Sequence, residues 1–248
     1  MSCSELPDSY LRNRLAVLDV RSASFRRVWD KVVSPGYRVD VCVRRLVAAR
    51  RIRRIGRGLY VVIDPVRTTP TIAVASGVFS EILHYVTTDA ALAHHGLIDQ
   101  PIFTFTVVLP RVRRPIHVDQ TTVIRPVTLD EQRIRAADAY DTTMEGFAIR
   151  VATREQAVVD ALAEPRWMDH GDLLPEILAA FSDEEVARTA SGVLGRTTAA
   201  AQRLGYLLEE AERPMPASLA ELRPVRAVQL RPQKRTRGPY SSRWRVYG

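Results

Sequence analysis

The apolar and polar positions of the first fifty residues predict three short helices. Asp8 can cap a first helix, whose apolar residues at roughly helical spacing are Tyr10, Leu11, Leu15 and Leu18. Ser24 can cap a second over residues 25–33, where apolar side chains again recur at helical spacing. Residues 34–36, Ser-Pro-Gly, then break the pattern in a short turn. The third helix follows and is predicted to bury a stripe of Val39, Cys42, Val43, Leu46 and Val47. Two short helices joined by a tight turn are the helix-turn-helix arrangement.

The pattern then changes to that of a β-hairpin. Residues 51–55 predict one strand, residues 56–58, Gly-Arg-Gly, predict a turn, and residues 59–63 predict the return strand. A hairpin directly after the third helix of such a unit is a wing. The sequence therefore predicts a winged helix-turn-helix domain over residues 1–67, which ends in a polar connector containing two prolines, residues 64–70.

Residues 68–222 predict a mixture of strands and helices. Alternating apolar residues predict a strand around residues 103–109, and Glu145-Gly146 predicts the turn of a second hairpin. Two capping boxes, at residues 153–156 and 182–185, predict the starts of later helices. The fold class expected for the chain is therefore α+β, an N-terminal winged helix-turn-helix followed by a mixed α+β C-terminal domain.

Net charge divides the chain into three parts. Residues 1–67 hold 15 basic and 6 acidic side chains, net +9, whereas residues 68–222 carry a net charge of −9. Residues 223–248 form a basic tail with 8 basic side chains and no acidic one. A basic head and tail around an acidic body favour a polyanionic partner for the two ends. The tail is expected either to contact DNA or to fold onto the acidic body.

Arginines occupy the outer positions of the third helix and of the wing. Arginine suits DNA because its planar guanidinium can bond phosphate oxygens, or the O6/N7 edge of guanine, with two hydrogen bonds. We expect base reading from three arginines of the helix, Arg38, Arg44 and Arg45. We expect phosphate contacts from three arginines of the wing, Arg53, Arg54 and Arg57. Arg51 completes the candidate DNA-binding set, and a winged helix that contacts protein is the alternative interpretation.

The sequence contains no familiar catalytic or metal-binding motif. His94 and His95 are adjacent, so on a helix they point about 100° apart and do not readily share one metal ion. Asp89 and Asp99 lie nearby, but the four residues lack the spacing of a zinc motif. Neither of the two lysines lies near the acidic residues of the segment 138–145, where a nuclease would need one. We therefore expect no catalytic residue, no metal and no cofactor.

The sequence gives no sign of a membrane or of an oxidising compartment. No apolar run approaches the roughly 20 residues that cross a bilayer. Charged residues interrupt residues 1–14, where a signal peptide would carry its apolar core. Two cysteines, Cys3 and Cys42, are too few for a disulfide framework. These features predict a cytoplasmic protein without a membrane partner.

Four stretches, taken in order, carry a family likeness. They are residues 46–60 (LVAARRIRRIGRGLY), 85–101 (YVTTDAALAHHGLIDQP), 151–162 (VATREQAVVDAL) and 195–208 (GRTTAAAQRLGYLL). In their order and spacing they resemble the AbiEi antitoxins of type IV toxin–antitoxin systems, including the mycobacterial antitoxins paired with MenT-type nucleotidyltransferase toxins.

The resemblance implies two activities. An N-terminal winged helix would bind repeats in the protein's own double-stranded promoter DNA and repress the operon, with a dimer on DNA as one arrangement. A C-terminal domain, without catalysis of its own, would neutralise a cognate nucleotidyltransferase toxin. The resemblance leaves open whether antitoxin and toxin form a direct complex.

Two other functions remain open at the level of sequence. One is a stand-alone winged-helix transcriptional regulator whose C-terminal domain senses a ligand. The other is a helix-turn-helix fused to a nuclease or transferase, for which Asp138 and Asp141 would be the carboxylates to test. The acidic helices of the body are either solvated faces or part of a docking surface for a basic partner.

Overall fold

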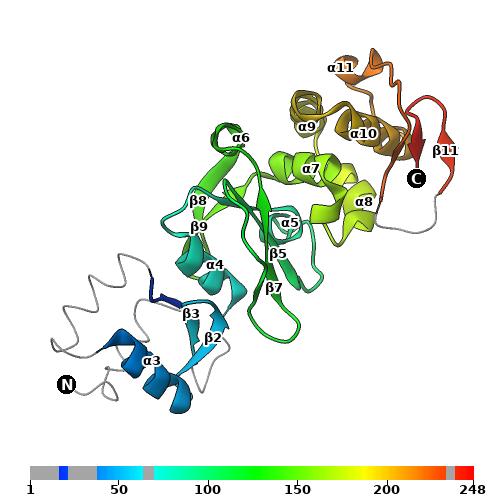
Figure 1. Ribbon diagram of the computed structural model, residues 1–248. Helices are drawn as coiled ribbons and strands as arrows, with labels where there is room; N and C mark the ends of the chain where they lie inside the picture. The colour runs from blue at the N-terminus through cyan, green and yellow to red at the C-terminus, as the bar shows by residue number, and fades with distance from the viewer. Residues whose placement is uncertain (1–16, 22–37, 64–69, 233–237) are drawn as a thin grey trace. The chain divides into compact units, whose positions relative to one another are not determined.

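The computed structural model describes residues 17–21, 38–63, 70–232 and 238–248 and confirms a mixed α+β fold (Figure 1). The second predicted helix, the turn at residues 34–36 and most of the first predicted helix lie outside the described residues. Leu18, which we predicted in the first helix, lies in strand β1 (Val17–Asp19), where pairing with a distant strand and not local apolar spacing sets the structure. The chain divides into two compact units. Unit 1 comprises residues 1–83, 114–125 and 142–149, and unit 2 comprises residues 84–113, 126–141 and 150–248. No helix in the described ranges has the length and apolar character needed to cross a membrane.

Unit 1 contains the helix and hairpin predicted for residues 39–63. Helix α3 (Val39–Ala48) leads into β2 (Ile52–Gly56) and β3 (Leu59–Val62), which pair antiparallel, and β3 also pairs with β1 (Val17–Asp19). The apolar core of this part consists of Leu18, Cys42, Val43, Leu46 and Ile52. Val47, predicted in the buried stripe, is 39% exposed, because one helical step of about 100° beyond Leu46 turns it away from the sheet. Helix α4 (Thr71–Phe79) also belongs to unit 1.

Cys42 lies at the centre of the α3 core. Its side chain is fully buried, and it is disulfide-bonded. The low cysteine count did not anticipate this bond, because a count of thiols carries no information on whether two of them lie within bonding distance.

The larger sheet has six strands in the order β6-β7-β5-β4-β9-β8. Short strand β4 (Tyr85–Thr87) lies inside it, antiparallel to β5 and parallel to β9, and all three of its residues are buried. The predicted turn at Glu145-Gly146 is present, and its φ angles of 49° and 86° fit the type I′ turn of a tight hairpin. The other strands are β5 (Thr104–Leu109), β6 (Ile116–His117), β7 (Val123–Thr128), β8 (Ala139–Met144) and β9 (Phe147–Ala152).

Helices make up most of the C-terminal half of unit 2 (Figure 1). Helix α7 (Arg154–Ala163) packs against α5 (Thr88–His94), α9 (Asp183–Arg196) and α10 (Thr198–Glu210). The remaining helices are α6 (Glu131–Ala136), η2 (Pro165–Trp167), η3 (Gly171–Leu173), α8 (Leu174–Ala179) and α11 (Ala217–Ala220).

A fully buried carboxylate joins these helices to the sheet. Asp160 of α7 accepts hydrogen bonds from the hydroxyls of Tyr85 and Thr87 on β4, at 2.9 and 2.8 Å. It also accepts bonds from Gln156 at 2.9 Å and from Arg196 of α9 at 3.2 Å. Burial raises the pKa of Asp160 above its ordinary value, and the nearby Arg196 opposes that shift. Four polar partners from three elements therefore meet at this buried carboxylate of unit 2.

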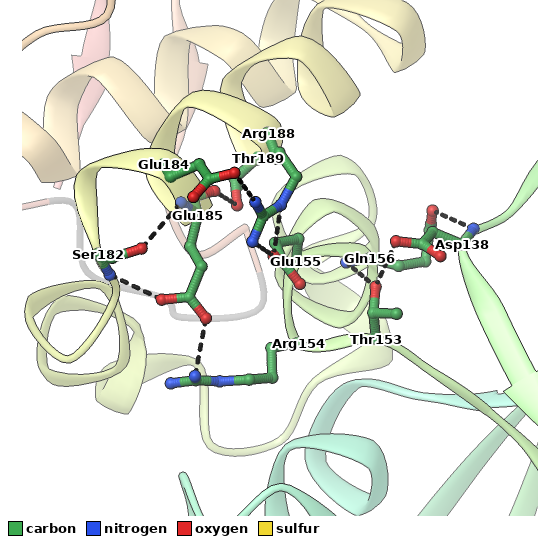
Figure 2. A network of polar contacts seen from close by, with 10 residues as sticks. All are labelled: Asp138, Thr153, Arg154, Glu155, Gln156, Ser182, Glu184, Glu185, Arg188 and Thr189. Atoms are coloured by element: carbon green, nitrogen blue, oxygen red, sulfur yellow. Dashed lines mark hydrogen bonds and ion pairs between the residues drawn. The ribbon is translucent and has the colours of Figure 1, made fainter. Parts of the chain in front are cut away.

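A second polar network links α7 to α9 near the protein surface (Figure 2). The predicted capping box at residues 182–185 is present, with Ser182 and Glu185 each bonding the other's backbone N–H. The same Glu185 carboxylate accepts a bond from Arg154 at 2.7 Å. Hydrogen bonding by the Ser182 N–H and the charge of Arg154 lower the pKa of Glu185. The start of α9 is thereby tied to the start of α7.

Only one side of the capping box predicted at residues 153–156 forms. The Thr153 hydroxyl accepts the backbone N–H of Gln156 at 3.3 Å, as expected of an N-cap. The Gln156 side chain does not return to Thr153, because its amide nitrogen bonds Asp160 and its amide oxygen accepts the N–H of Asp138 at 3.2 Å.

The described part of the basic tail folds onto helix α10. Strands β10 (Val228–Gln229), β11 (Tyr240–Ser241) and β12 (Val246–Tyr247) form a small sheet, and β10 and β12 contact α10. Trp244 is 1% exposed, and its ring lies so close over Gly205 of α10 that a Cβ at that position would overlap with it. The Trp244 Nε1 donates to the carboxylate of Glu209. Of the two arrangements considered for the tail, these residues adopt the fold onto the acidic body.

Candidate nucleic-acid interface

Two of the predicted base-reading arginines share one carboxylate at the start of α3. Arg38 is the N-cap residue, and its Nε and Nη2 each donate to one oxygen of Asp40 at 3.1 Å. Arg44, one turn later, donates from Nη2 to Asp40 Oδ2 at 3.1 Å and from Nε to the Asp40 carbonyl at 3.3 Å. The Arg38 and Arg44 side chains remain 77% and 76% exposed. Both arginines were predicted on the outer face of the third helix and lie there, but their shared contact with Asp40 was not predicted.

The other two helix-side arginines lie at the end of α3 and just beyond it. Arg45 is exposed in the last turn of α3. Arg51 connects the helix to the hairpin through its backbone, because its N–H donates to the Leu46 carbonyl and its own carbonyl accepts the N–H of Ile63, both at 2.9 Å. Arg51 is half-buried and takes part in a further interaction within the protein.

The tip of the β2–β3 hairpin is basic and glycine-rich. Arg57 is exposed there, and Arg54 donates from Nε to the carbonyl of Gly56 at 3.1 Å, which holds its side chain along the turn. Gly58 has a φ of +74°, which favours glycine. A Cβ at that position would come within 2.8 Å of the Arg21 guanidinium. The absence of a side chain at Gly58 therefore makes room for a further arginine.

Arg21 is the residue at this tip that sequence reasoning missed. The register of β1 against β3 pairs Asp19 with Leu59, and Val20 donates its N–H to the Gly58 carbonyl at 3.0 Å. This pairing therefore places Arg21 beside the hairpin turn, where its side chain is 53% exposed. No local pattern around residue 21 indicates this, because the contact depends on strand pairing across about forty residues of sequence.

Arg53 forms a hydrogen bond within unit 1, away from the hairpin tip. Its Nη2 donates to the backbone carbonyl of Val118, in the segment that follows β6 (Ile116–His117). Strand β6 also contacts β2, so this bond fastens the segment 114–125 against the hairpin. Of the three arginines predicted to contact phosphate, Arg54 and Arg57 lie close together at the tip, and Arg53 bonds protein backbone.

The resulting surface is suited to a polyanion. Guanidinium groups remain charged at any physiological pH, and α3 and the hairpin present several of them with donors directed outward. Two acidic side chains lie among them in the part of unit 1 that the structure describes. Asp19 pairs with Arg21 at 3.5 Å. The bonds that Asp40 accepts from Arg38, then Arg44, lower its pKa, so it stays ionised. Outward guanidinium donors can bond phosphate oxygens or base edges, which is the chemistry of DNA recognition.

Unit 2 places its histidines and carboxylates in structural contacts. His95 bonds the carbonyl of Ala152 at 2.9 Å. Asp89 is buried and accepts from the ring and backbone N–H groups of His170, at 2.8 and 2.9 Å. Asp138 accepts from the Thr153 hydroxyl at 3.1 Å. Among the residues that the structure describes, no three histidine, cysteine or acidic side chains gather as a metal site would require.

Comparisons with known proteins agree with this architecture. The sequence profile of the AbiEi antitoxin C-terminal domain matches residues 85–210. The crystal structure of the RV2827C protein from Mycobacterium tuberculosis is similar in fold, with a TM-score of 0.66 and 19% sequence identity. That similarity covers 98% of this chain and 90% of the other. A comparison with curated protein sequences returns no match.

Proposed function

Because the chain belongs to the AbiEi antitoxin family and is thus an antitoxin of a toxin–antitoxin system, we propose that it binds its own promoter DNA through unit 1 and represses its operon. The observation that carries this proposal is the arginine surface formed by α3 and the β2–β3 hairpin. A helix followed by a hairpin, both bearing exposed arginines, fits a winged helix-turn-helix with α3 in the major groove and the hairpin along the backbone.

The roles of the individual arginines follow from their positions. Arg38, Arg44 and Arg45 lie on the exposed side of α3 and are assigned to base edges. Arg54 and Arg57 at the hairpin tip are assigned to phosphates, and Arg21 joins them there. Arg51 and Arg53 support the hairpin, since one links it to α3 through backbone bonds and the other bonds the Val118 carbonyl. In this proposal five of the seven arginines predicted from the sequence contact DNA, and Arg51 and Arg53 support the hairpin instead.

The toxin-directed activity belongs to the rest of the chain in this proposal. Residues 85–210 carry the family match, and residues 68–222 hold a net charge of −9, opposite in sign to the DNA-binding part. We assign to this part the neutralisation of a nucleotidyltransferase toxin, without catalysis by the antitoxin. An acidic body is repelled by DNA phosphates, so its charge favours the separation of the two activities.

Replacement of Arg57 tests the DNA half of the proposal. Arg57→Ala should weaken binding to all duplexes about equally, because a phosphate contact carries no sequence information. It should also reduce the slope of log affinity against log salt concentration by about 0.9, the value for one phosphate contact. Fluorescence anisotropy with promoter and shuffled duplexes, between 50 and 200 mM salt, measures both quantities.

Arg135→Ala is the matched control for that experiment. Arg135 is an exposed arginine on α6 in unit 2, with an ion pair to Glu131, and its loss removes the same charge from the chain. The control variant should bind with the wild-type salt slope. An unchanged slope in Arg57→Ala, or an equal change in both variants, would contradict a phosphate contact at the hairpin tip.

A further inference from the structure

An acidic side chain lies in the middle of the arginine surface of α3. Asp40 bonds Arg38 through two parallel contacts of 3.1 Å and bonds Arg44 through a third of the same length. The Arg44 Nε also donates to the Asp40 backbone carbonyl. One carboxylate therefore restrains two arginine side chains, one at the N-cap of the helix and the other about one and a half turns later.

Stability does not account for this arrangement. The Asp40 side chain is 47% exposed, and both arginines are more exposed still, so water and salt screen the ion pairs. Exposed ion pairs of this kind contribute little to folding. What they do restrict is the number of side-chain conformations that each arginine adopts before any ligand arrives, and a long flexible side chain otherwise loses that freedom on binding.

The bonds to Asp40 also leave donors available. Arg38 uses Nε and one Nη2 hydrogen, and a guanidinium has five N–H groups in a fixed plane. The remaining donors can meet the O6 and N7 atoms of a guanine while the Asp40 contact is kept. A carboxylate at the same place repels phosphate oxygens, so it opposes binding in which both arginines simply contact the DNA backbone.

From this geometry, and resting on the proposed DNA binding, we infer that Asp40 is a specificity-determining positioning residue. It holds Arg38 and Arg44 in the orientation for base edges and opposes their use on phosphates. The protein gives up some affinity for arbitrary DNA and gains discrimination in favour of its own site.

A purely structural role for Asp40 makes a different prediction. Asp40 lies in the first turn of α3, where a negative charge interacts favourably with the helix dipole. Loss of that interaction would lower the melting temperature of the protein slightly and would reduce its affinity for every duplex by the same factor. The ratio of affinities for two duplexes separates the two roles.

The experiment compares Asp40→Asn with the wild-type full-length chain. Anisotropy gives affinities for a duplex that spans the region upstream of the coding sequence and for a shuffled duplex of equal composition. We expect the preference for the upstream duplex to fall about tenfold, the equivalent of one base contact. Affinity for the shuffled duplex should rise about threefold, since a repulsive charge is removed and two arginines are released.

Asp119→Asn is the matched control. Asp119 is also a carboxylate of unit 1, but its hydrogen bonds come from Thr121 and Thr122. The same change of charge there should leave the preference for the upstream duplex as in the wild type. A wild-type preference retained in Asp40→Asn would overturn the inference and leave the proposed function standing. A wild-type chain with no preference for the upstream duplex would overturn both.

Discussion

Replacement of Asp160 by alanine should lower the free energy of unfolding by about 3–5 kcal/mol, the cost of leaving a buried charge without its partner. Arg196 is 16% exposed in the folded chain and would lose its carboxylate. The hydroxyls of Tyr85 and Thr87 would lose their acceptor at the same time, in a site that excludes water. Urea denaturation followed by circular dichroism measures the change.

Two further variants identify the cause of that loss. Asp141→Ala removes an exposed carboxylate of unit 2 and should change the free energy of unfolding by less than about 0.5 kcal/mol. The double variant Asp160→Asn with Arg196→Met leaves no buried charge at the site and should be more stable than Asp160→Asn. If Asp160→Asn and the double variant were equally stable, the unpaired charge of Arg196 would not be the cause of the stability lost on replacing Asp160.

Replacement of Trp244 by alanine should release the C-terminal segment from α10. Trp244 is the largest fully buried side chain among the described residues, and loss of a buried tryptophan costs about 3–5 kcal/mol. The contact of its ring with Gly205 and its bond to Glu209 are both lost. We expect a lower free energy of unfolding and rapid cleavage by trypsin after the arginines of the tail, measured by limited proteolysis with mass spectrometry.

Val225→Ala controls for a change of apolar area in the same segment. Val225 is 79% exposed, so its truncation should leave both stability and the cleavage pattern as in the wild type. A Trp244→Ala chain as stable and as resistant to trypsin as Val225→Ala would contradict the packing of the tail on α10.

Local patterns in the sequence were sufficient for elements whose signals are local. The α3 helix and the hairpin follow from apolar spacing and the Gly-Arg-Gly turn, and the capping box at residues 182–185 follows from residue types three positions apart. Strand β4 was missed because it has three residues, all buried, and such a strand shows no alternation of apolar and polar positions.

Contacts between distant parts of the chain were beyond these patterns. Arg53 was assigned to phosphate because its neighbours are arginines, but its acceptor is the carbonyl of Val118, 65 residues later. Gln156 fits the capping-box pattern with Thr153, yet the buried Asp160 offers its amide a second partner one turn away. Arg21 reaches the hairpin tip through strand pairing. In each of these positions tertiary structure selects the partner, and sequence spacing does not encode it.

The most direct test of the two-part function measures repression and toxin neutralisation in the same cells. The full-length chain carrying Arg44→Ala and Arg57→Ala would be co-expressed with the product of the adjacent gene, the proposed toxin, together with a reporter driven by the upstream promoter region. We expect the double variant to lose repression of the reporter and to rescue growth as well as the wild type, at equal protein levels. Retained repression, or growth rescue lost together with repression, would contradict the assignment of DNA binding to unit 1 and neutralisation to the rest of the chain.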